Sequence, residues 1–274
     1  MSVQTENSRK LGKLWGLKQW LLVIVPLLAL VIWVAASFLS EGSESKEVFD
    51  GLPHSYSYLE KESPGPIRLH MMSVSPEDVI LRTARSPLRQ VVAYGINGGF
   101  FYGKDLLSIA IMNDIPISGD KKAYGSGWFN AKYPRGTLVW DGRSRKLSIQ
   151  VASSGEDLEV SDRTQYWAQG GISMNLQDEG LWLSSATQEH LPYADELRMR
   201  SGLVYDNTGK LWLIVTPSRC TAGEFRTAIL ESVPGEDPEG IFLDGDGSSQ
   251  MNASEAVLVG DKRMVVQMIA VGGD

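Results

Sequence analysis

Two carboxylates and two hydroxyls follow a strand-forming run in the segment 241–250, IFLDGDGSSQ. The carboxylates are Asp244 and Asp246, the hydroxyls are Ser248 and Ser249, and two glycines lie among them. Two carboxyl groups with split pKa values can divide acid and base roles, and glycine loops let backbone N–H groups approach an anion. A turn capped by Asp244 would need only about two such residues. The clustering at a strand end therefore favours a ligand site over a plain turn.

Three further stretches also lie at strand ends and carry glycine or basic residues. They are GINGGFF from Gly95, WAQGGISM from Trp167 and RMRSG from Arg198. Each stretch alone is more often a turn than a site. Four of them on one small domain indicate a shared cleft, and loops of this kind suit an anion, above all a phosphate.

In order and spacing these motifs resemble the phosphodiester glycosidase family, from about Ala93 to Met251. The usual family pattern is Asn-Gly-Gly-Phe-Phe, a Gly-Gly-Gly-Pro segment, Arg-Thr-Ala, and Leu-Asp-Gly-Gly-Gly-Ser-Ser. The family includes a lysosomal enzyme that removes N-acetylglucosamine from a phosphodiester. The resemblance implies that one cleft is lined by Asn97, Gly98, Gly99, Gly170, Gly171, Arg200, Asp244, Gly245, Gly247, Ser248 and Ser249.

Three motifs depart from the family pattern. Asp246 stands at the middle glycine of the last motif, and Ile172 stands at the usual proline. Ser201 and Gly202 follow Arg200 where the family has Thr-Ala. The change at Asp246 alters the loop that is expected to hold phosphate, which keeps a non-catalytic function open.

The family reaction breaks the bond between an anomeric carbon and a phosphodiester oxygen, and the leaving phosphate needs little help from a general acid. For this reaction the residues of the expected cleft offer three catalytic candidates. Asp244 would activate water or stabilise an oxocarbenium-like transition state, Asp246 would be its partner carboxylate, and Arg200 would bind phosphate through two parallel hydrogen bonds. The other substrate contacts are expected from Asn97, Gly98, Gly99, Gln169, Gly170, Gly171, Gly245, Gly247, Ser248 and Ser249.

Two functions follow from these residues. The first is an exported, membrane-anchored hydrolase that cleaves the sugar–phosphate bond of an N-acetylglucosamine-like sugar-1-phosphodiester in envelope or extracellular glycopolymers. The alternative is a non-catalytic surface module that binds phosphorylated glycans, or a component of an envelope-biogenesis or sporulation assembly. Convergence of Asp244, Arg200 and Asn97 on one open pocket would favour the first function.

A calcium site is the minority alternative to a cofactor-free site. Six side chains fall at ligand positions of an EF-hand-like loop: Asp244, Asp246, Ser248, Gln250, Asn252 and Glu255. However, Ser249 occupies the position that needs glycine, and no helix pair flanks the loop. The three histidines are scattered without zinc-site spacing, so we expect no cofactor.

The N-terminal sequence predicts a membrane anchor. Residues 19–40, QWLLVIVPLLALVIWVAASFLS, carry no charge and can cross the roughly 30 Å core of a bilayer as a helix. Residues 1–18 hold four basic side chains and one acidic one, which keeps this segment cytoplasmic. A polar linker, 41–47, leads to an extracytoplasmic domain, 48–274. A signal peptide cleaved near VAAS, residues 34–37, is the alternative, but its apolar region would span only about 7–15 residues.

Charge and cysteine content restrict the partners and the compartment. Outside residues 1–40 lie 22 of the 26 basic and 32 of the 33 acidic residues, a net charge of −10. This charge argues against nucleic acid or anionic lipid as the partner of the outer domain. A locally positive site can still bind an anionic substrate, so the expected partner is a phosphorylated glycan or sugar-1-phosphodiester. Cys220 is the only cysteine, so no intramolecular disulfide can form, and we expect a buried, unreactive thiol. An exported domain without disulfides is typical of a bacterial surface protein with a large core.

The secondary-structure elements that must position these residues are predicted to be mainly strands. Strand–turn–strand patterns span 136–152, 201–216 and 255–271, while 87–96 is a strand or a short helix leading to a strand. A helix is expected after Thr221, which forms a capping box with Glu224. With 43% hydrophobic and 22% charged residues, the sequence predicts one β-rich α+β domain of mixed or antiparallel sheet with few helices.

Overall fold

The computed structural model describes residues 26–28, 30, 49 and 51–272. Contacts along the chain separate Met1–Asp50 from a folded domain, Gly51–Asp274. The expected cytoplasmic segment 1–18, the linker 41–47 and nearly all of the expected membrane helix 19–40 lie outside the described residues. Within the described part of the chain, no helix is long and apolar enough to cross a membrane.

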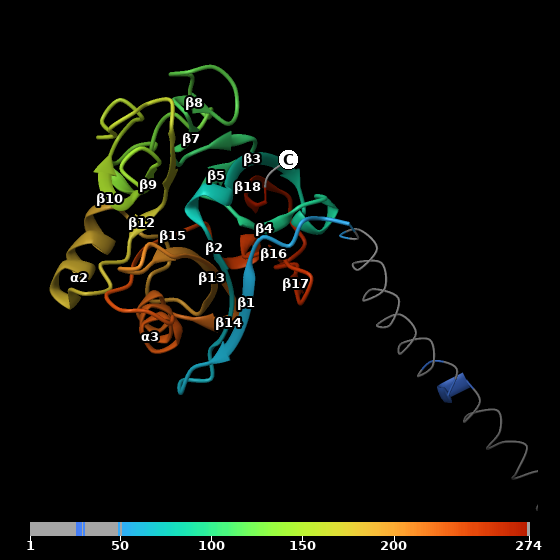
Figure 1. Cartoon of the computed structure of the whole chain (residues 1–274). Coiled ribbons are helices and arrows are strands. Elements are labelled where there is room, and N and C mark those ends of the chain that lie inside the picture. The colour runs from blue at the N-terminus through green and yellow to red at the C-terminus, as the bar shows by residue number, and fades with distance from the viewer. Residues whose placement is uncertain (1–25, 29, 31–48, 50, 273–274) are drawn as a thin grey trace, which may run out of the picture. The chain divides into compact units, whose positions relative to one another are not determined.

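Antiparallel sheets form most of the domain (Figure 1). The largest has six strands, in the order β1 (Ser57–Glu62), β2 (Arg68–Val74), β14 (Leu211–Cys220), β13 (Arg198–Tyr205), β15 (Glu239–Phe242) and β12 (Ile172–Ser173). All pairings in this sheet are antiparallel. The predicted β-rich domain with few helices is confirmed.

Two five-stranded sheets and one small hairpin complete the β structure of the described domain. The first five-stranded sheet has the order β10 (Lys146–Ala152), β9 (Arg135–Asp141), β11 (Tyr166–Gly170), β7 (Ala110–Met112) and β8 (Ile115–Pro116). The second has the order β17 (Val257–Leu258), β16 (Met251–Asn252), β4 (Tyr94–Asn97), β18 (Val265–Val271) and β3 (Val79–Ser86). The hairpin joins β5 (Phe101–Tyr102) to β6 (Asp105–Leu106).

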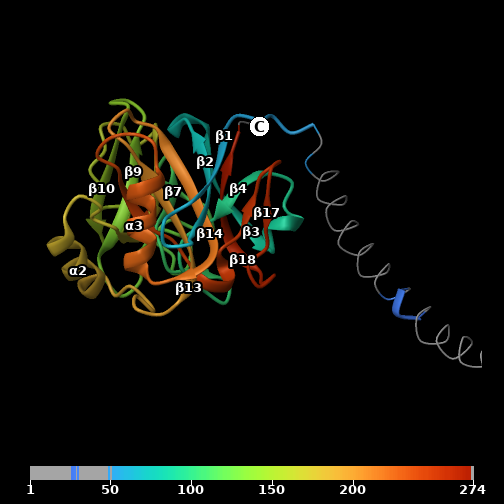
Figure 2. The same ribbon diagram turned by 90° about the horizontal axis from the view of Figure 1, so that it is seen from below.

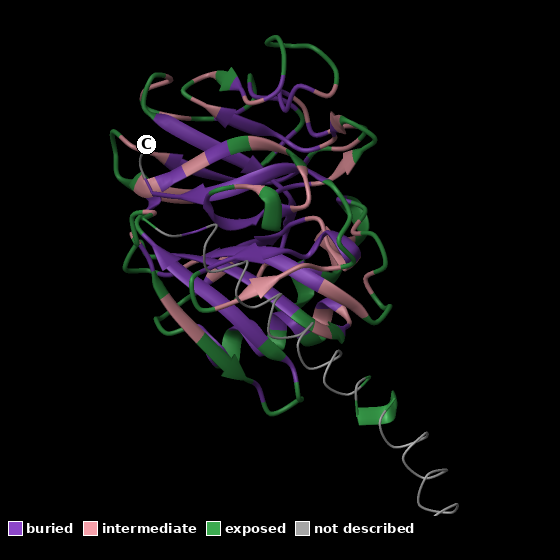
Figure 3. Ribbon diagram, turned by 90° about the vertical axis from the view of Figure 1, so that its right-hand side faces the viewer, coloured by how far each residue is buried: buried purple, intermediate pink, exposed green. Residues whose placement is uncertain are grey.

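The two described α-helices of the domain, α2 (Glu179–Gln188) and α3 (Ala222–Ser232), pack against the six-stranded sheet. Trp182 of α2 and Phe225 of α3 contribute to the same core cluster as Met71 and Ile214 of the sheet. Figure 2 shows α3 alongside the strands of this sheet, and Figure 3 shows that the buried residues follow the strand interiors while the turns are exposed. The core therefore lies on the sheet faces, and the strand ends are free to carry a site.

Several predicted elements are confirmed. The β9–β10 and β13–β14 hairpins occupy the expected stretches 136–152 and 201–216. Helix α3 begins after Thr221, whose hydroxyl accepts from the Glu224 amide while the Glu224 carboxylate accepts from the Thr221 amide. In 87–96 a 3₁₀ turn, Leu88–Gln90, leads to β4.

The predicted hairpin over 255–271 is wrong. Strand β17 pairs with β16, whereas β18 pairs with β3 and β4. The intervening turn packs on the segment 244–249 instead, because the Asp261 amide donates to the Gly247 carbonyl at 3.2 Å. Gly260 makes this approach possible with a φ of 55°, and a Cβ there would collide with the Gly247 carbonyl oxygen.

The pair Gly170–Gly171 carries the chain from one sheet to another. Strand β11 ends at Gly170 in a five-stranded sheet, and β12 begins at Ile172 in the six-stranded sheet. At the crossing, the Gly171 amide donates to the Gly136 carbonyl at 2.8 Å. A Cβ on Gly171 would collide with the Phe242 carbonyl oxygen, so only glycine allows the two sheets to approach this closely.

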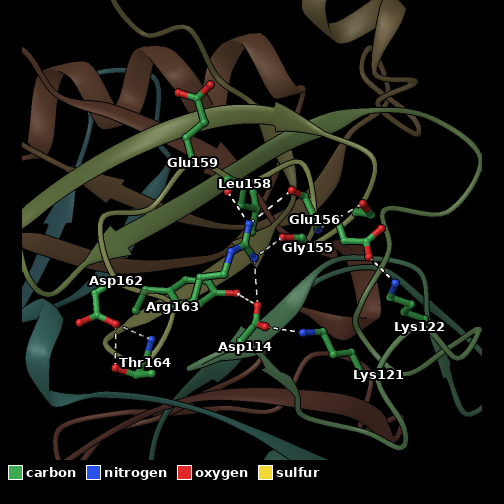
Figure 4. Close-up of polar contacts among 12 residues, drawn as sticks. Asp114, Lys121, Lys122, Gly155, Glu156, Leu158, Glu159, Asp162, Arg163 and Thr164 are labelled. Carbon is green, nitrogen blue, oxygen red and sulfur yellow. Dashed lines mark hydrogen bonds and ion pairs between the residues drawn. The ribbon is translucent and has the colours of Figure 1, made fainter.

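Arg163 organises the loops beside β7 and β10 (Figure 4). Its guanidinium donates to the Asp114 carboxylate at 2.9 Å and to the carbonyls of Gly155, Glu156 and Leu158. Lys121 also pairs with Asp114, so both carboxylate oxygens are occupied. This cluster is a structural tie between loops and offers no free group for a ligand.

Candidate active site

A pocket of about 220 Å³ lies where the start of β13, the loop after β15 and the loop between α2 and β13 meet. Its wall combines two carboxylates, three arginines and several apolar side chains. The lining residues are Phe100, Leu191, Pro192, Tyr193, Arg198, Arg200, Phe242, Leu243, Asp244, Gly245, Asp246 and Arg263. The structure thus brings together the three residues predicted to be catalytic.

Asp244 is partly buried at the end of β15, and burial raises the pKa of its carboxyl to about 6. The Ser248 hydroxyl, the Arg263 charge and the Gly245 amide oppose this shift, while the Asp246 charge adds to it. A carboxyl with a pKa near 6 is ionised at neutral pH and is still basic enough to accept a proton. Asp244 therefore has the property that a general base needs.

Arg200 is a buried guanidinium that binds backbone carbonyls. Its Nε donates to Cys220 at 3.3 Å, and its Nη2 donates to Tyr193 at 2.6 Å and Glu196 at 2.9 Å. No carboxylate lies within ion-pair distance among the described residues, and burial lowers its pKa. Its Nη1 makes no hydrogen bond within the described chain, so one guanidinium nitrogen, and not the predicted pair, is available to a phosphate. A buried cation without a carboxylate partner beside a pocket suits an anionic ligand.

Asp246 lies on the rim of the pocket in an ion pair with Arg198, at 2.8 Å. The guanidinium of Arg198 also lies over the Tyr193 ring, 4.6 Å from its centroid. Asp246 has a φ of 54°, in the left-handed region that glycine tolerates best. The residue that replaces the family's middle glycine therefore keeps a glycine-like backbone conformation and adds a carboxylate to the rim.

The prediction that Asn97 contacts substrate needs correction. Asn97 is fully buried, and its Oδ1 accepts from Ser201 and from the Gln250 amide, at 2.8 Å and 3.1 Å. Its Nδ2 donates to the Asp244 carbonyl at 2.7 Å. With both ends of the amide engaged, Asn97 ties β4 and β13 to the loop that carries Asp244. It positions the site and does not line it.

The amides of Gly98 and Gly99 do not form the expected phosphate cradle. Gly98 donates to the Gln267 carbonyl and Gly99 donates to the Gln267 side chain, both at 3.0 Å. Gln169 is buried, and its side-chain amide pairs with that of Gln267. These residues form an internal amide network beneath the site because β18 packs directly against the end of β4.

Gly170 and Gly171 also lie away from the pocket lining, contrary to prediction. Their amides donate to the carbonyls of Ile109 and Gly136, at 2.6 Å and 2.8 Å. Their glycine character serves the crossing between sheets. A glycine pair at a strand end indicates that another group approaches the backbone closely. At Gly170 and Gly171 that group is the backbone of neighbouring segments and not a ligand.

Only part of the loop 245–249 can contact a ligand in the pocket. Gly245 lines the pocket, whereas the Ser248 and Ser249 amides close the loop on the carbonyls of Gly245 and Asp246. Both serine hydroxyls are buried without a partner of hydrogen-bond geometry among the described residues. Gly247 packs against the Asp261–Arg263 ion pair, which holds this loop from behind.

Sequence reasoning missed Arg263 and the wall formed by Leu191, Pro192 and Tyr193. Arg263 lines the pocket, and its hydrogen bonds to Asp261 raise its pKa. Its sequence context, GDKR, is that of any solvated turn. Only the packing of that turn on the loop 245–249 brings the guanidinium to the site, so no local signal could have identified it.

The side chains of the alternative calcium loop serve different partners. Gln250 accepts from the Leu88 amide at 2.8 Å, and Asn252 donates to the Leu88 carbonyl at 2.6 Å. Glu255 accepts from Tyr56 at 3.0 Å. Within the described chain no group of three or more metal-ligating His, Cys, Asp or Glu residues occurs. Cys220 is buried, as predicted, and burial raises the pKa of its thiol to about 11.

Comparison with models of protein families finds no match, and a search of curated proteins finds none. Among solved structures, a "hypothetical protein from Synechocystis" aligns with a TM-score of 0.40 at 13% identity, over 79% of this chain and 61% of that one. A "Putative exported protein" from Burkholderia pseudomallei K96243 aligns with a TM-score of 0.33 at 12% identity, over 80% and 58%. The chain thus spans about three fifths of the length of these structures, and neither likeness bears on activity.

Proposed function

We propose that this protein is an exported, membrane-anchored hydrolase that cleaves the sugar–phosphate bond of a sugar-1-phosphodiester, with an N-acetylglucosamine-like sugar. One observation carries the proposal: a carboxyl with a pKa of about 6, Asp244, shares a small pocket with Arg200, a buried guanidinium that has no carboxylate partner among the described residues. A base and an anion-binding cation on one pocket are what hydrolysis of a phosphodiester-linked sugar requires.

In the proposed reaction, water attacks the anomeric carbon of the sugar. The bond between that carbon and the phosphate oxygen breaks, and its electron pair leaves with the phosphate as a monoester. Asp244 takes the proton that the attacking water loses. Arg200 holds the phosphate, while Arg263 adds positive charge at the pocket wall. Asp246 orients Arg198 through their ion pair and helps to shape the rim.

The test is hydrolysis by the full chain of a panel of sugar-1-phosphodiesters, including an N-acetylglucosamine-1-phosphodiester and UDP-sugars. Asp244→Asn should lower kcat by at least about 100-fold, because it removes the base but keeps the shape of the site. Arg200→Lys should raise KM and lower kcat/KM. Asp120→Asn, an exposed change at a carboxylate that does not line the pocket, is the matched control and should leave turnover intact. Turnover by Asp244→Asn at the normal rate would reject the assignment.

One observation favours the second function, a non-catalytic module that binds phosphorylated glycans. The Gly98 and Gly99 amides donate to Gln267, which removes two donors that would otherwise stabilise a transition state. For such a module, no diester would be turned over, yet phosphorylated sugars would bind and Arg200→Ala would abolish that binding. The two functions are therefore separated by one set of measurements.

A further inference from the structure

The pocket is too small to hold a whole phosphodiester substrate. Its volume, about 220 Å³, lies below the roughly 300–1,000 Å³ that is usual for small-molecule sites. The sugar and the phosphate must lie beside Asp244 and Arg200 for the proposed chemistry. The group esterified to the other side of the phosphate must then extend beyond the pocket, over a neighbouring surface.

A larger depression of about 580 Å³ adjoins the pocket and shares Leu191 and Pro192 with it. We call it the α2 groove, because it runs between α2 and the loop that follows that helix. Six of its nine lining residues are apolar. The lining is Trp182, Leu183, Ala186, Thr187, His190, Leu191, Pro192, Ala194 and Asp195.

The polar side chains of the α2 groove are poorly suited to a nucleotide or a sugar. Its lining contains no lysine or arginine, and Asp195 would repel a second phosphate. The Thr187 hydroxyl donates to the Leu183 carbonyl at 3.0 Å. The His190 ring stacks on Tyr133, with centroids 3.6 Å apart. Few groups are left to recognise hydroxyls or charge.

Apolar surface is unusually exposed around the α2 groove. Leu183 of the groove lining is 60% exposed, and Tyr193 and Leu197 of the loop after α2 are 59% and 58% exposed. Both ribbon views place α2 at the periphery of the domain, where no other described element covers its outer side (Figures 1 and 2). Exposed apolar side chains along a groove that adjoins a polar pocket are typical of a binding surface.

The groove wall is held in place by two buried arginines. Arg135 donates to the Glu189 carbonyl at 2.9 Å, and Arg200 donates to the carbonyls of Tyr193 and Glu196. Because the same Arg200 also lines the pocket, the phosphate site and the groove wall share one rigid support. The groove is therefore preformed, which lowers the entropic cost of binding a flexible chain.

We propose that the alcohol esterified to the departing phosphate is a long aliphatic chain, alkyl or isoprenoid, which lies in the α2 groove while the phosphate is bound beside Arg200. This inference rests on the proposed function for the position of the phosphate. It narrows the substrate class to a lipid-linked sugar phosphate, with Leu183, Ala186 and Leu191 contacting the chain.

Binding of alkyl phosphates tests the groove without requiring turnover. We would measure the affinity of the full chain for methyl, butyl and octyl phosphate, all below their aggregation concentrations. Affinity should rise roughly fourfold for each methylene that the groove buries. Leu183→Asp should reduce the ratio of octyl to methyl affinity at least tenfold. Leu230→Asp, which alters a leucine that is 43% exposed on α3, is the matched control and should preserve the ratio.

Hydrolysis of N-acetylglucosamine-1-phosphodiesters whose second ester group is methyl, octyl or glucosyl separates this inference from the proposed function. Chain-length-dependent binding without any hydrolysis would leave the groove assignment standing and reject the hydrolase. The assignment of the groove would be rejected if methyl and octyl diesters were hydrolysed with the same kcat/KM and the affinity for alkyl phosphates did not depend on chain length. Self-association of the protein that Leu183→Asp abolishes would also reject it, because the surface would then belong to a second copy.

Discussion

At the level of a single residue, the burial of Asp244 favours its role as a base and disfavours the stability of the folded protein. Burial gives its carboxyl the raised pKa that suits a base, but the same burial disfavours the charged form of the folded protein. The site is therefore expected to cost stability at the pH at which it works, a trade between stability and activity that is common at functional sites.

The first prediction concerns Asp244→Asn. The pKa of Asp244 rises from an ordinary 3.8 to about 6 in the folded state, so the folded protein holds this proton more tightly than the unfolded chain does. Stability from this group is greatest below pH 4 and falls as pH rises to about 6, where the loss levels off at no more than about 3 kcal/mol. Asp244→Asn should thus gain stability relative to the wild type between pH 4 and pH 7, as measured by urea denaturation.

Asp141→Asn is a control of opposite sign for that measurement. Although burial opposes the shift, hydrogen bonds from Ser161 and Ser144 hold the pKa of Asp141 at about 2. Its stabilising contribution is present above pH 4 and is lost as pH falls toward 2. Asp141→Asn should therefore be less stable than the wild type throughout pH 4 to 7. If Asp244→Asn behaved in the same way, its carboxyl would not be destabilised by burial.

The second prediction concerns the backbone at Asp246, whose φ is 54°. Asp246→Gly relieves the left-handed conformation but removes the partner of Arg198, so stability should change by less than about 1 kcal/mol. Asp246→Val places a β-branched residue at the same φ and should cost about 2 kcal/mol or more. Equal urea midpoints for the two variants would contradict the assigned conformation.

At the level of elements, the turn between β17 and β18 acts as a support for the loop 244–249. Gly260→Ala would force a Cβ into the Gly247 carbonyl at a positive φ, and we expect a loss of about 2–4 kcal/mol. Gly209→Ala is matched to it, since Gly209 also has a positive φ but faces open space, and should cost only about 1 kcal/mol. Thermal denaturation of both variants gives the comparison, and equal losses would refute the packing of this turn on the loop.

The capping box of α3 supports a fourth prediction. Thr221→Ala removes the hydroxyl that accepts from the Glu224 amide and should lower the free energy of unfolding by about 1 kcal/mol. Thr227→Ala lies within the same helix, where alanine is the better helix former, and should be neutral or slightly stabilising. A loss at Thr227 equal to that at Thr221 would show that the cap is not the cause.

The sequence predicted elements whose signals are local. The α3 capping box and the turns of the β9–β10 and β13–β14 hairpins are each encoded within a few residues. Helix α2 escaped prediction because Trp182 is its only buried side chain, so it lacks an apolar stripe. The order of strands in the sheets depends on pairings between distant segments, which no local pattern encodes.

The same distinction between local signals and distant pairings explains which residues of the candidate site could be predicted. Asp244 and Arg200 could be found because each is a functional side chain at a strand end. Asn97 and Gln169 were assigned to ligand binding because polar residues beside glycines resemble a loop open to solvent. The structure instead gives each an internal partner, since β18 and β13 pack over the end of β4 and β11. Whether a polar side chain meets a ligand or another strand is decided by tertiary packing.

At the scale of the whole domain, the acidic charge and the site are separate properties. The net charge outside residues 1–40 is −10, yet three arginines line the pocket beside Asp244 and Asp246. The surrounding negative field would slow the approach of polyanions, while the local arginines would retain a single phosphate. This distribution fits the proposed substrate, which carries one phosphodiester, better than a nucleic acid or a polyphosphate.

The crossing at Gly170–Gly171 has a kinetic consequence. Because β11 and β12 are consecutive segments of one continuous backbone, neither sheet can separate from its neighbours without disturbing the other. The most protected amides of the two sheets, such as those of Ala168 and Leu203, should therefore exchange with deuterium through the same global opening and with the same denaturant dependence. Two glycines without side chains thus make the two sheets one unit of hydrogen exchange.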